Sequence, residues 1–69
     1  MVKRLCYLPK GDTAVITRIK KAPRLQALGL TPGAVVCCKY KSDRVMVLEV
    51  GQCMVALRTC QLCKVWADY

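Results

Sequence analysis

The 69-residue sequence contains no histidine and only four acidic residues. Without histidine, a nucleophilic cysteine or serine lacks its usual general base. The acidic residues are scattered along the chain, so no pair of carboxylates indicates acid–base chemistry; they are Asp12, Asp43, Glu49 and Asp68. A phosphate-binding loop of the GxxxxGK(S/T) type is also missing. The sequence therefore predicts a protein that is not an enzyme and that carries no cofactor.

Long hydrophobic runs are missing as well. The longest uninterrupted apolar stretch, residues 34–38, falls far short of the roughly 18 residues that cross a bilayer. The N-terminal MVKRLCYL carries two positive charges, like the start of a signal peptide, but the turn at residues 9–12 ends its apolar stretch before a secretory core forms. We therefore expect a cytoplasmic protein that reaches the inner face of the membrane only through a partner.

Positive charge dominates what is present, because 12 lysines and arginines give the chain a net charge of +8. This excess predicts attraction to an anionic partner, such as nucleic acid, lipid headgroups or an acidic protein face. A solvated surface without a partner is the alternative interpretation. The basic residues form two clusters along the sequence, one at Arg18, Lys20, Lys21 and Arg24 and the other at Lys39, Lys41 and Arg44.

Aromatic residues are few, and phenylalanine is absent. Barrels that bind single-stranded nucleic acid combine positive charge with stacking aromatic side chains. This chain offers only Tyr7, Tyr40, Tyr69 and Trp66, and we expect Trp66 to lie in the core. Nucleic acid is therefore a less favoured partner than an acidic protein face, and a proline-peptide groove lined with aromatics is not expected.

Six cysteines stand out in so short a chain. Cytosolic thiols stay reduced, and Cys37, Cys38 and Cys53 lie in or beside apolar segments, where cysteine serves as a small hydrophobe. The CQLC motif that joins Cys60 to Cys63 has the spacing of a metal or redox pair, but structural zinc needs four ligands. Cys37 and Cys38 are poor candidates for the other two ligands, because neighbours in a strand point to opposite faces. We predict no metal site and keep Cys60 and Cys63 as weak candidates.

Alternating apolar and polar residues predict five short strands joined by tight turns. The strands lie at residues 14–19, 34–40, 45–50, 53–57 and 64–67. In the second of them, Val36, Cys38 and Tyr40 are predicted to share one face. One domain of residues 1–69 is too small for a two-sheet sandwich. We therefore predict an all-β fold with a short helical insertion, a small five-stranded SH3-like barrel, with an OB-type barrel as the alternative.

The stretch PRLQALGLTPGAVV, residues 23–36, interrupts this β pattern. Pro23 suits the first position of a helix, and Gly29 can adopt the left-handed conformation that ends one. The Thr31-Pro32-Gly33 sequence has the order that a type II turn prefers. Because so short a helix is not stable alone, we expect its leucines to hold it by plugging one open end of the barrel; they are Leu25, Leu28 and Leu30.

These residues resemble those of a known family. The segment RLxxLGLxPG at residues 24–33 is the specific part, and LxxG, AxIxxI and ALR accompany it at residues 8–11, 14–19 and 56–58. Over residues 8–67 the chain is similar to the ferrous iron transport protein A family, FeoA. The resemblance implies an SH3-like barrel with a helical insertion that works beside the membrane transporter FeoB, which carries a GTP-binding domain. The same domain occurs at the C-terminus of diphtheria-toxin-repressor-type regulators.

From this resemblance we expect an accessory protein of ferrous iron uptake that binds the cytosolic region of FeoB and modulates its assembly or activity. The alternatives are a small basic nucleic-acid-binding barrel and a thiol-based metal carrier, and weak self-association is a further interpretation. If Leu28 is a core residue, the interface lies elsewhere. The expected contact residues are Arg18, Lys20, Lys21, Arg24, Leu25, Leu28, Gly29, Leu30, Pro32, Gly33 and Arg58.

Overall fold

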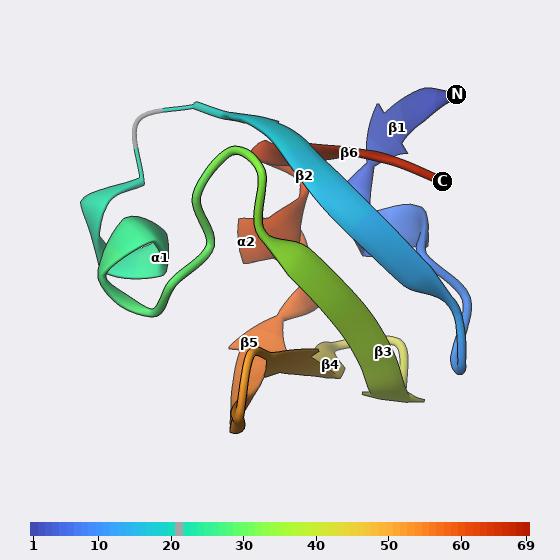
Figure 1. Cartoon of the computed structure of the whole chain (residues 1–69). Coiled ribbons are helices and arrows are strands. Elements are labelled where there is room, and N and C mark those ends of the chain that lie inside the picture. Colours follow the sequence, from blue (N-terminus) through green and yellow to red (C-terminus); the bar gives the residue numbers. More distant parts are fainter. Residues whose placement is uncertain (21) are drawn as a thin grey trace.

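Six antiparallel strands form one curved sheet in the computed structural model, which describes residues 1–20 and 22–69 (Figure 1). A 3-10 helix, η1 (Leu5–Tyr7), and two short α-helices, α1 (Pro23–Ala27) and α2 (Thr59–Leu62), connect them. Neighbouring strands follow the order β1-β6-β2-β3-β4-β5. The strands are β1 (Val2–Arg4), β2 (Thr13–Ile19), β3 (Val35–Lys41), β4 (Val45–Val50), β5 (Cys53–Arg58) and β6 (Val65–Asp68). Lys21, one of the expected contact residues, lies outside the described residues.

Alternate residues of the strands fill the core, as the period-two pattern predicts. Cys38 is fully buried and Cys37 half-buried, which confirms that the two point to opposite faces. Cys53 is exposed, so the expectation of a core role is wrong for this cysteine. It begins β5 beside the turn at Gly51, where the β4–β5 hairpin reaches solvent. The inward strand residues include Ala14, Ile16, Val36, Met46, Leu48, Leu57, Val65 and Ala67.

The N-terminal segment adds a strand that the sequence pattern does not predict, so the sheet has six strands where five were expected. β1 pairs with β6 in antiparallel register, with Val2 opposite Asp68 and Arg4 opposite Trp66. All three β1 side chains are exposed, and therefore no alternation marks the strand in the sequence. The following η1 buries Leu5 and Cys6 in the core. The β1 strand therefore forms because it pairs with β6, a strand from the opposite end of the chain.

A β-bulge changes the outer half of β3. The pairing of β3 with β4 shifts between Cys38 and Tyr40. A bulge inserts one extra residue and turns the next side chains over, and Tyr40 is accordingly 52% exposed. The prediction that Tyr40 shares the inner face of Val36 and Cys38 is therefore wrong. Lys41, beyond the bulge, donates a hydrogen bond from Nζ to the carbonyl of Leu8 at 3.2 Å, so this lysine ties β3 to the N-terminal segment.

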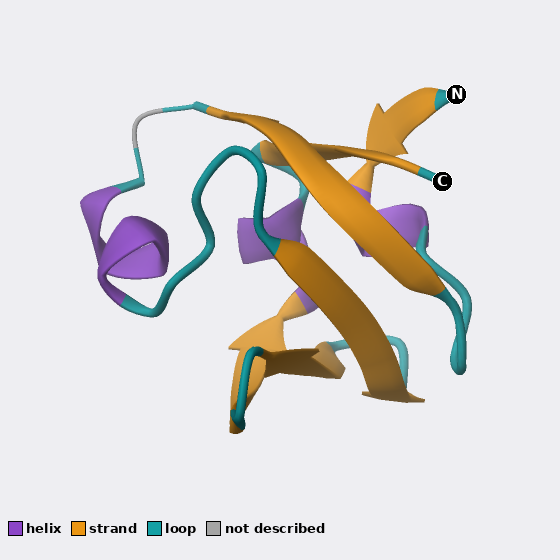
Figure 2. Cartoon of the chain, in the orientation of Figure 1, coloured by secondary structure: helices purple, strands orange, loops and turns teal. Residues whose placement is uncertain are grey.

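The predicted insertion forms between the ends of β2 and β3, where α1 stands as a separate helical turn (Figure 2). Pro23 occupies the first turn of α1, as expected. The amide of Gly29 donates to the carbonyl of Gln26 at 3.0 Å, and Gly29 has a φ of 95°, which confirms its left-handed role at the helix end. The amide of Leu30 then donates back to the carbonyl of Leu25 at 3.1 Å. The helix is thus closed by backbone bonds that a glycine makes accessible.

The turn after the helix has the geometry that its sequence predicts. The amide of Ala34 donates to the carbonyl of Thr31 at 2.9 Å, and Gly33 has a φ of 91° at the third position. This is the pattern of a type II turn. The amide of Gly33 also donates to the carbonyl of Ile16 at 2.7 Å. The insertion is therefore anchored to β2 at the turn.

Replacing Gly29 by alanine is expected to lower the free energy of unfolding by about 1–2 kcal/mol, because a side chain disfavours the left-handed conformation. An added Cβ would lie 3.4 Å from Cγ1 of Val50, an ordinary van der Waals contact, so the loss comes from the backbone conformation. Urea denaturation monitored by circular dichroism measures the change. Gln26→Ala, an exposed substitution within α1, is the control and should stay within about 0.5 kcal/mol of the wild type. Equal midpoints for both variants would show that Gly29 carries no conformational constraint.

Candidate functional site

The three leucines of the insertion do not share one environment. Leu25 and Leu30 are 4% and 0% exposed, whereas Leu28 is 42% exposed. The helix ends at Ala27, and Leu28 therefore follows the last helical residue instead of stacking one turn above Leu25. The prediction that all three leucines plug the barrel holds for Leu25 and Leu30 and is wrong for Leu28. An apolar side chain thus projects into solvent from a segment that two other leucines hold in place.

A groove runs between α1 and α2, two helices that lie far apart in the sequence. Its volume is about 230 Å³, and we call it the α1 groove. The side-chain Oε1 of Gln61 accepts a hydrogen bond from the amide of Arg58 at 3.2 Å, which fixes the α2 wall. Its apolar floor includes Leu25, and Arg24 and Lys64 supply positive charge at its rim. The lining residues are Ala22, Pro23, Arg24, Leu25, Gln61 and Lys64.

A second, larger hollow adjoins the α1 groove at Lys64, which lines both. Its volume is about 460 Å³, and we call it the basic pocket. Three of its lining side chains are cationic, and the described lining of both hollows contains no acidic residue. The two hollows therefore present one continuous positive surface. The lining residues of the basic pocket are Arg4, Lys20, Cys60, Cys63, Lys64 and Trp66.

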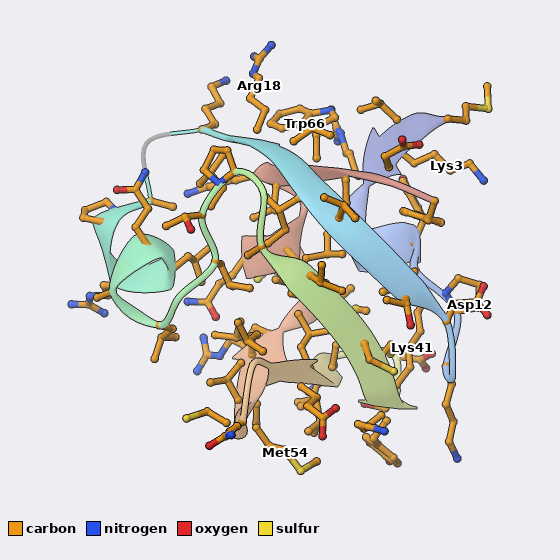
Figure 3. The ribbon with its side chains drawn as sticks, viewed as in Figure 1. Lys3, Asp12, Arg18, Lys41, Met54 and Trp66 are labelled. Carbon is orange, nitrogen blue, oxygen red and sulfur yellow. The ribbon has the colours of Figure 1, made fainter. Side chains whose placement is uncertain are left out.

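Trp66 lies on the outer face of the sheet between two arginines, and the prediction that it belongs to the core is wrong. It is half-buried, because Val65 and Ala67 take the inward positions of β6 and leave Trp66 to face out. The guanidinium carbons of Arg18 and Arg4 lie 4.9 and 5.8 Å from its ring centroid (Figure 3 labels Arg18 and Trp66). Since β6 lies between β1 and β2, both arginines sit directly across from Trp66. Cation–π contacts of this kind hold guanidinium groups in fixed positions.

The fold brings Arg18, Lys20 and Arg24 to this side of the molecule. Lys20 lines the basic pocket, Arg24 lines the α1 groove, and Arg18 stacks on Trp66. The expectation that Leu30 contacts a partner is wrong, because Leu30 is fully buried in the core. Pro32 and Gly33 are exposed in the type II turn. Arg58 is exposed at the end of β5 and lines a separate hollow that meets the basic pocket only at Cys60.

Two basic residues of the surface, Arg4 and Lys64, escape sequence reasoning. Each belongs to a segment at one end of the chain, and only the placement of β6 between β1 and β2 brings them beside Lys20. In the other predicted basic cluster, at residues 39–44, two lysines make contacts within the protein. Lys39 lies 4.0 Å from the carboxylate of Glu49, and Lys41 binds the carbonyl of Leu8. Charge along the sequence therefore did not reveal which cations remain available for a partner.

The cysteines of the CQLC motif do not face each other as a pair. Cys60 is exposed, whereas Sγ of Cys63 lies 3.1 Å from Sγ of Cys6 and 3.6 Å from the carbonyl oxygen of Thr59. Burial, together with the neighbouring Cys63, raises the pKa of the Cys6 thiol to about 11. Among residues 1–20 and 22–69, no three histidine, cysteine or acidic side chains gather in an arrangement that could hold a metal ion. Within the same residues, no helix has the length and apolar character needed to span a membrane.

The sheet order, the helical insertion and the outward basic surface are those of a small SH3-like domain. The chain belongs to the FeoA family, because the FeoA domain model matches residues 3–68. Proteins of this family are non-catalytic accessory or regulatory domains, and the family is associated with ferrous iron uptake.

Solved structures confirm the expected SH3-like fold. A crystal structure described as the iron uptake regulatory protein FeoA has a TM-score of 0.91 and 24% identity over 97% of this chain and 96% of that chain. A FeoA-like protein from Clostridium acetobutylicum has a TM-score of 0.88 and 11% identity over 97% of this chain and 85% of that chain. The T. acidophilum regulator IdeR has a TM-score of 0.85 and 21% identity over 96% of this chain but 33% of that chain. No curated protein sequence matches the chain.

Proposed function

We propose that this protein is an accessory protein of ferrous iron uptake that binds the cytosolic region of a FeoB-type GTP-binding transporter and modulates its assembly or activity. In this proposal, residues 1–69 act as one binding domain in the cytoplasm, recruited to the inner face of the membrane by the transporter. Membership of the FeoA family supports the transporter as partner, since the family is generally associated with FeoB.

The observation that carries the proposal is the exposed Leu28, which follows α1 in the same insertion that supplies Arg24 to the rim of the α1 groove. Protein interfaces combine an apolar centre with a polar rim. Leu28, with 42% of its surface exposed, supplies an apolar contact, and Arg24 and Lys64 supply the charged rim. The cationic lining favours a partner face rich in carboxylates, because charge complementarity steers association and selects the partner.

Leu28→Glu is expected to weaken binding to the isolated cytosolic GTP-binding domain of the transporter by at least tenfold, or about 1.4 kcal/mol. The substitution removes the apolar contact and sets a negative charge against the acidic partner face. Isothermal titration calorimetry with the full chain measures the affinity. Because Leu28 is exposed, the melting temperature should stay close to that of the wild type.

Met54→Glu is the matched control, since Met54 is a 60% exposed apolar residue on β5 and does not belong to the insertion that carries Leu28 and Arg24. It introduces the same charge and should leave the affinity unchanged. Equal loss of binding in both variants would point to a general charge effect and would remove the α1 groove from the proposal. Unchanged binding by Leu28→Glu would place the interface elsewhere on the domain.

Nucleic acid is the less supported partner, because the aromatic ring of the basic surface is already occupied. Arg4 and Arg18 flank Trp66, whereas single-strand binding uses aromatic faces that are free to stack with bases. A titration of single-stranded RNA over a range of salt concentrations separates the two functions. Binding at physiological salt that weakens linearly in log salt, together with no affinity for the transporter domain, would favour the nucleic-acid function.

A further inference from the structure

Two thiols from opposite ends of the chain meet beneath the basic pocket. Cys6 lies in η1 and Cys63 directly follows α2, 57 positions later, and their sulfur atoms are 3.1 Å apart. Cys6 is buried, with 4% of its surface exposed, and packs in the hydrophobic core. Cys63 is half-buried and lines the basic pocket. One sulfur of the pair therefore reaches solvent through this pocket, and the other lies behind it.

The spacing of the two sulfurs suits a covalent bond better than a shared metal ion. Thiolates bind zinc at about 2.3 Å with tetrahedral angles, which holds two ligand sulfurs about 3.8 Å apart. A disulfide needs an S–S distance of about 2.05 Å, which is about 1 Å shorter than the contact between the two sulfurs. Within the described chain no third ligand of the histidine, cysteine or acidic type completes a metal group. The contact is therefore that of a dithiol.

Positive charge surrounds the exposed member of the pair. Arg4, Lys20 and Lys64 line the same pocket as Cys63, and the pocket lining contains no acidic side chain among the described residues. These cations attract an anionic reactant into the pocket and raise its local concentration. The volume of about 460 Å³ accommodates a small molecule.

We propose that Cys6 and Cys63 form a thiol–disulfide exchange site whose substrate is an anionic low-molecular-weight disulfide. The Cys63 thiolate attacks one sulfur of the substrate, its S–S bond breaks, and one substrate thiolate leaves. The Cys6 thiol gives its proton to that thiolate, and the Cys6 sulfur attacks Cys63 and displaces the second substrate thiolate. The protein dithiol is oxidised to a disulfide, and the substrate is reduced to two thiols, which carry the two protons lost by the protein.

Burial gives the two sulfurs different roles in this exchange. The Cys6 thiol keeps its proton at neutral pH, since its pKa is raised to about 11. The more accessible Cys63 therefore reacts first, and Cys6 resolves the mixed disulfide. The resolving step should accelerate as the pH rises from 7 towards 11, because more Cys6 becomes thiolate. The exchange site exists on this domain whether or not the α1 groove binds a transporter.

Peptide mapping of the full chain tests the proposal. The fully reduced protein is treated with oxidised glutathione, quenched with N-ethylmaleimide and digested with trypsin without reduction. We expect a disulfide between peptides 5–10 and 59–64, with Cys60 alkylated and with four N-ethylmaleimide groups on the protein instead of the six that the reduced form would carry. The Cys60→Ser variant should form the same link, which assigns the bond to Cys63. A link between Cys60 and Cys63 within peptide 59–64, or a fully alkylated protein, would overturn the proposal.

Single substitutions separate the two steps. Cys6→Ala should accumulate glutathione on Cys63, because the resolving thiol is gone, while Cys63→Ala should leave Cys6 alkylated. Circular dichroism verifies that each variant is folded. If a variant is unfolded, the peptide map of the wild-type protein still tests the proposal. Stoichiometric Zn²⁺ binding by the reduced wild type, lost in Cys6→Ala, would identify a metal site instead and overturn the proposal.

The charge of the substrate provides an independent test. Oxidised glutathione should react about tenfold faster than cystamine, a cationic disulfide, at low ionic strength. The difference should shrink in high salt, because salt screens the lysines and arginines of the pocket. Arg4→Gln and Lys20→Gln should reduce the preference, whereas Lys39→Gln, outside the pocket, should keep it. Faster reaction with cystamine would contradict an anionic substrate.

Discussion

Leu30→Ala is expected to lower the free energy of unfolding by about 3 kcal/mol, through lost burial and the cavity left behind. Leu30 is fully buried and joins the hydrophobic core from the segment after α1. A domain of this size has a stability on the order of 5 kcal/mol, so the loss is a large part of the total. The melting temperature should fall by roughly 15 °C. Differential scanning calorimetry and urea denaturation measure both quantities.

Leu28→Ala is the matched control for this experiment. The same side chain is removed two positions earlier in the same insertion, from a residue that is 42% exposed. We expect its free energy of unfolding to stay within about 0.5 kcal/mol of the wild type. A similar loss for both variants would mean that Leu28 belongs to the core plug, and the docking role of the exposed leucine would fail with it.

Oxidation of the Cys6–Cys63 pair is expected to raise the free energy of unfolding by about 4 kcal/mol, because the bond would close a loop spanning 57 positions in the unfolded chain. The native structure should change little, since the two sulfurs are already in contact. Urea denaturation of the oxidised and fully reduced proteins measures the difference. The midpoint of the oxidised protein should return to the reduced value after a strong thiol reductant is added.

Two variants show whether this gain comes from the proposed bond. Cys60→Ser retains both sulfurs of the pair and should gain as much stability on oxidation as the wild type. Cys63→Ala cannot form the bond, and its midpoint should not respond to the oxidant. An oxidised wild type that is less stable than the reduced protein would show that the bond distorts the packing of η1 against α2.

The α1 groove and the exchange site share a structural element. Gln61 and Lys64 line the groove, and Cys63 lies between them in the sequence with its sulfur directed to Cys6. The α2 segment therefore contributes both to the docking surface and to the dithiol. The Cys6→Ala and Leu28→Glu variants distinguish the two functions. Cys6→Ala removes one sulfur of the dithiol, Leu28→Glu changes the insertion, and neither residue lines the α1 groove or the basic pocket.

The sequence predicted the insertion in unusual detail. Pro23, Gly29 and the Pro32-Gly33 pair each have backbone preferences that act locally, and the structure places all of them as expected. The alternating strands were likewise predictable, because inward and outward positions follow a period of two along one strand. The FeoA resemblance in residues 24–33 rests on the same local features.

Other predictions failed, and two of these failures depend on neighbours that are distant in the chain. The β1 strand has no pattern of its own and exists through pairing with β6. Trp66 is hydrophobic enough for a core, yet its position between Val65 and Ala67 turns it outward, where Arg4 and Arg18 cover it. Leu28 has the spacing of a core leucine, but α1 ends one residue too early to bury it.

By itself, the sequence determined the local backbone conformations of this protein: where strands alternate, where the helix of the insertion begins, and where a glycine ends it. These conformations depend on side-chain and backbone preferences of adjacent residues. Only the tertiary structure decided which cations form one surface, which leucine stays in solvent, and that the partner of Cys63 is Cys6 and not Cys60. The reason is that strand order brings together segments from opposite ends of the chain, and no local preference encodes those contacts.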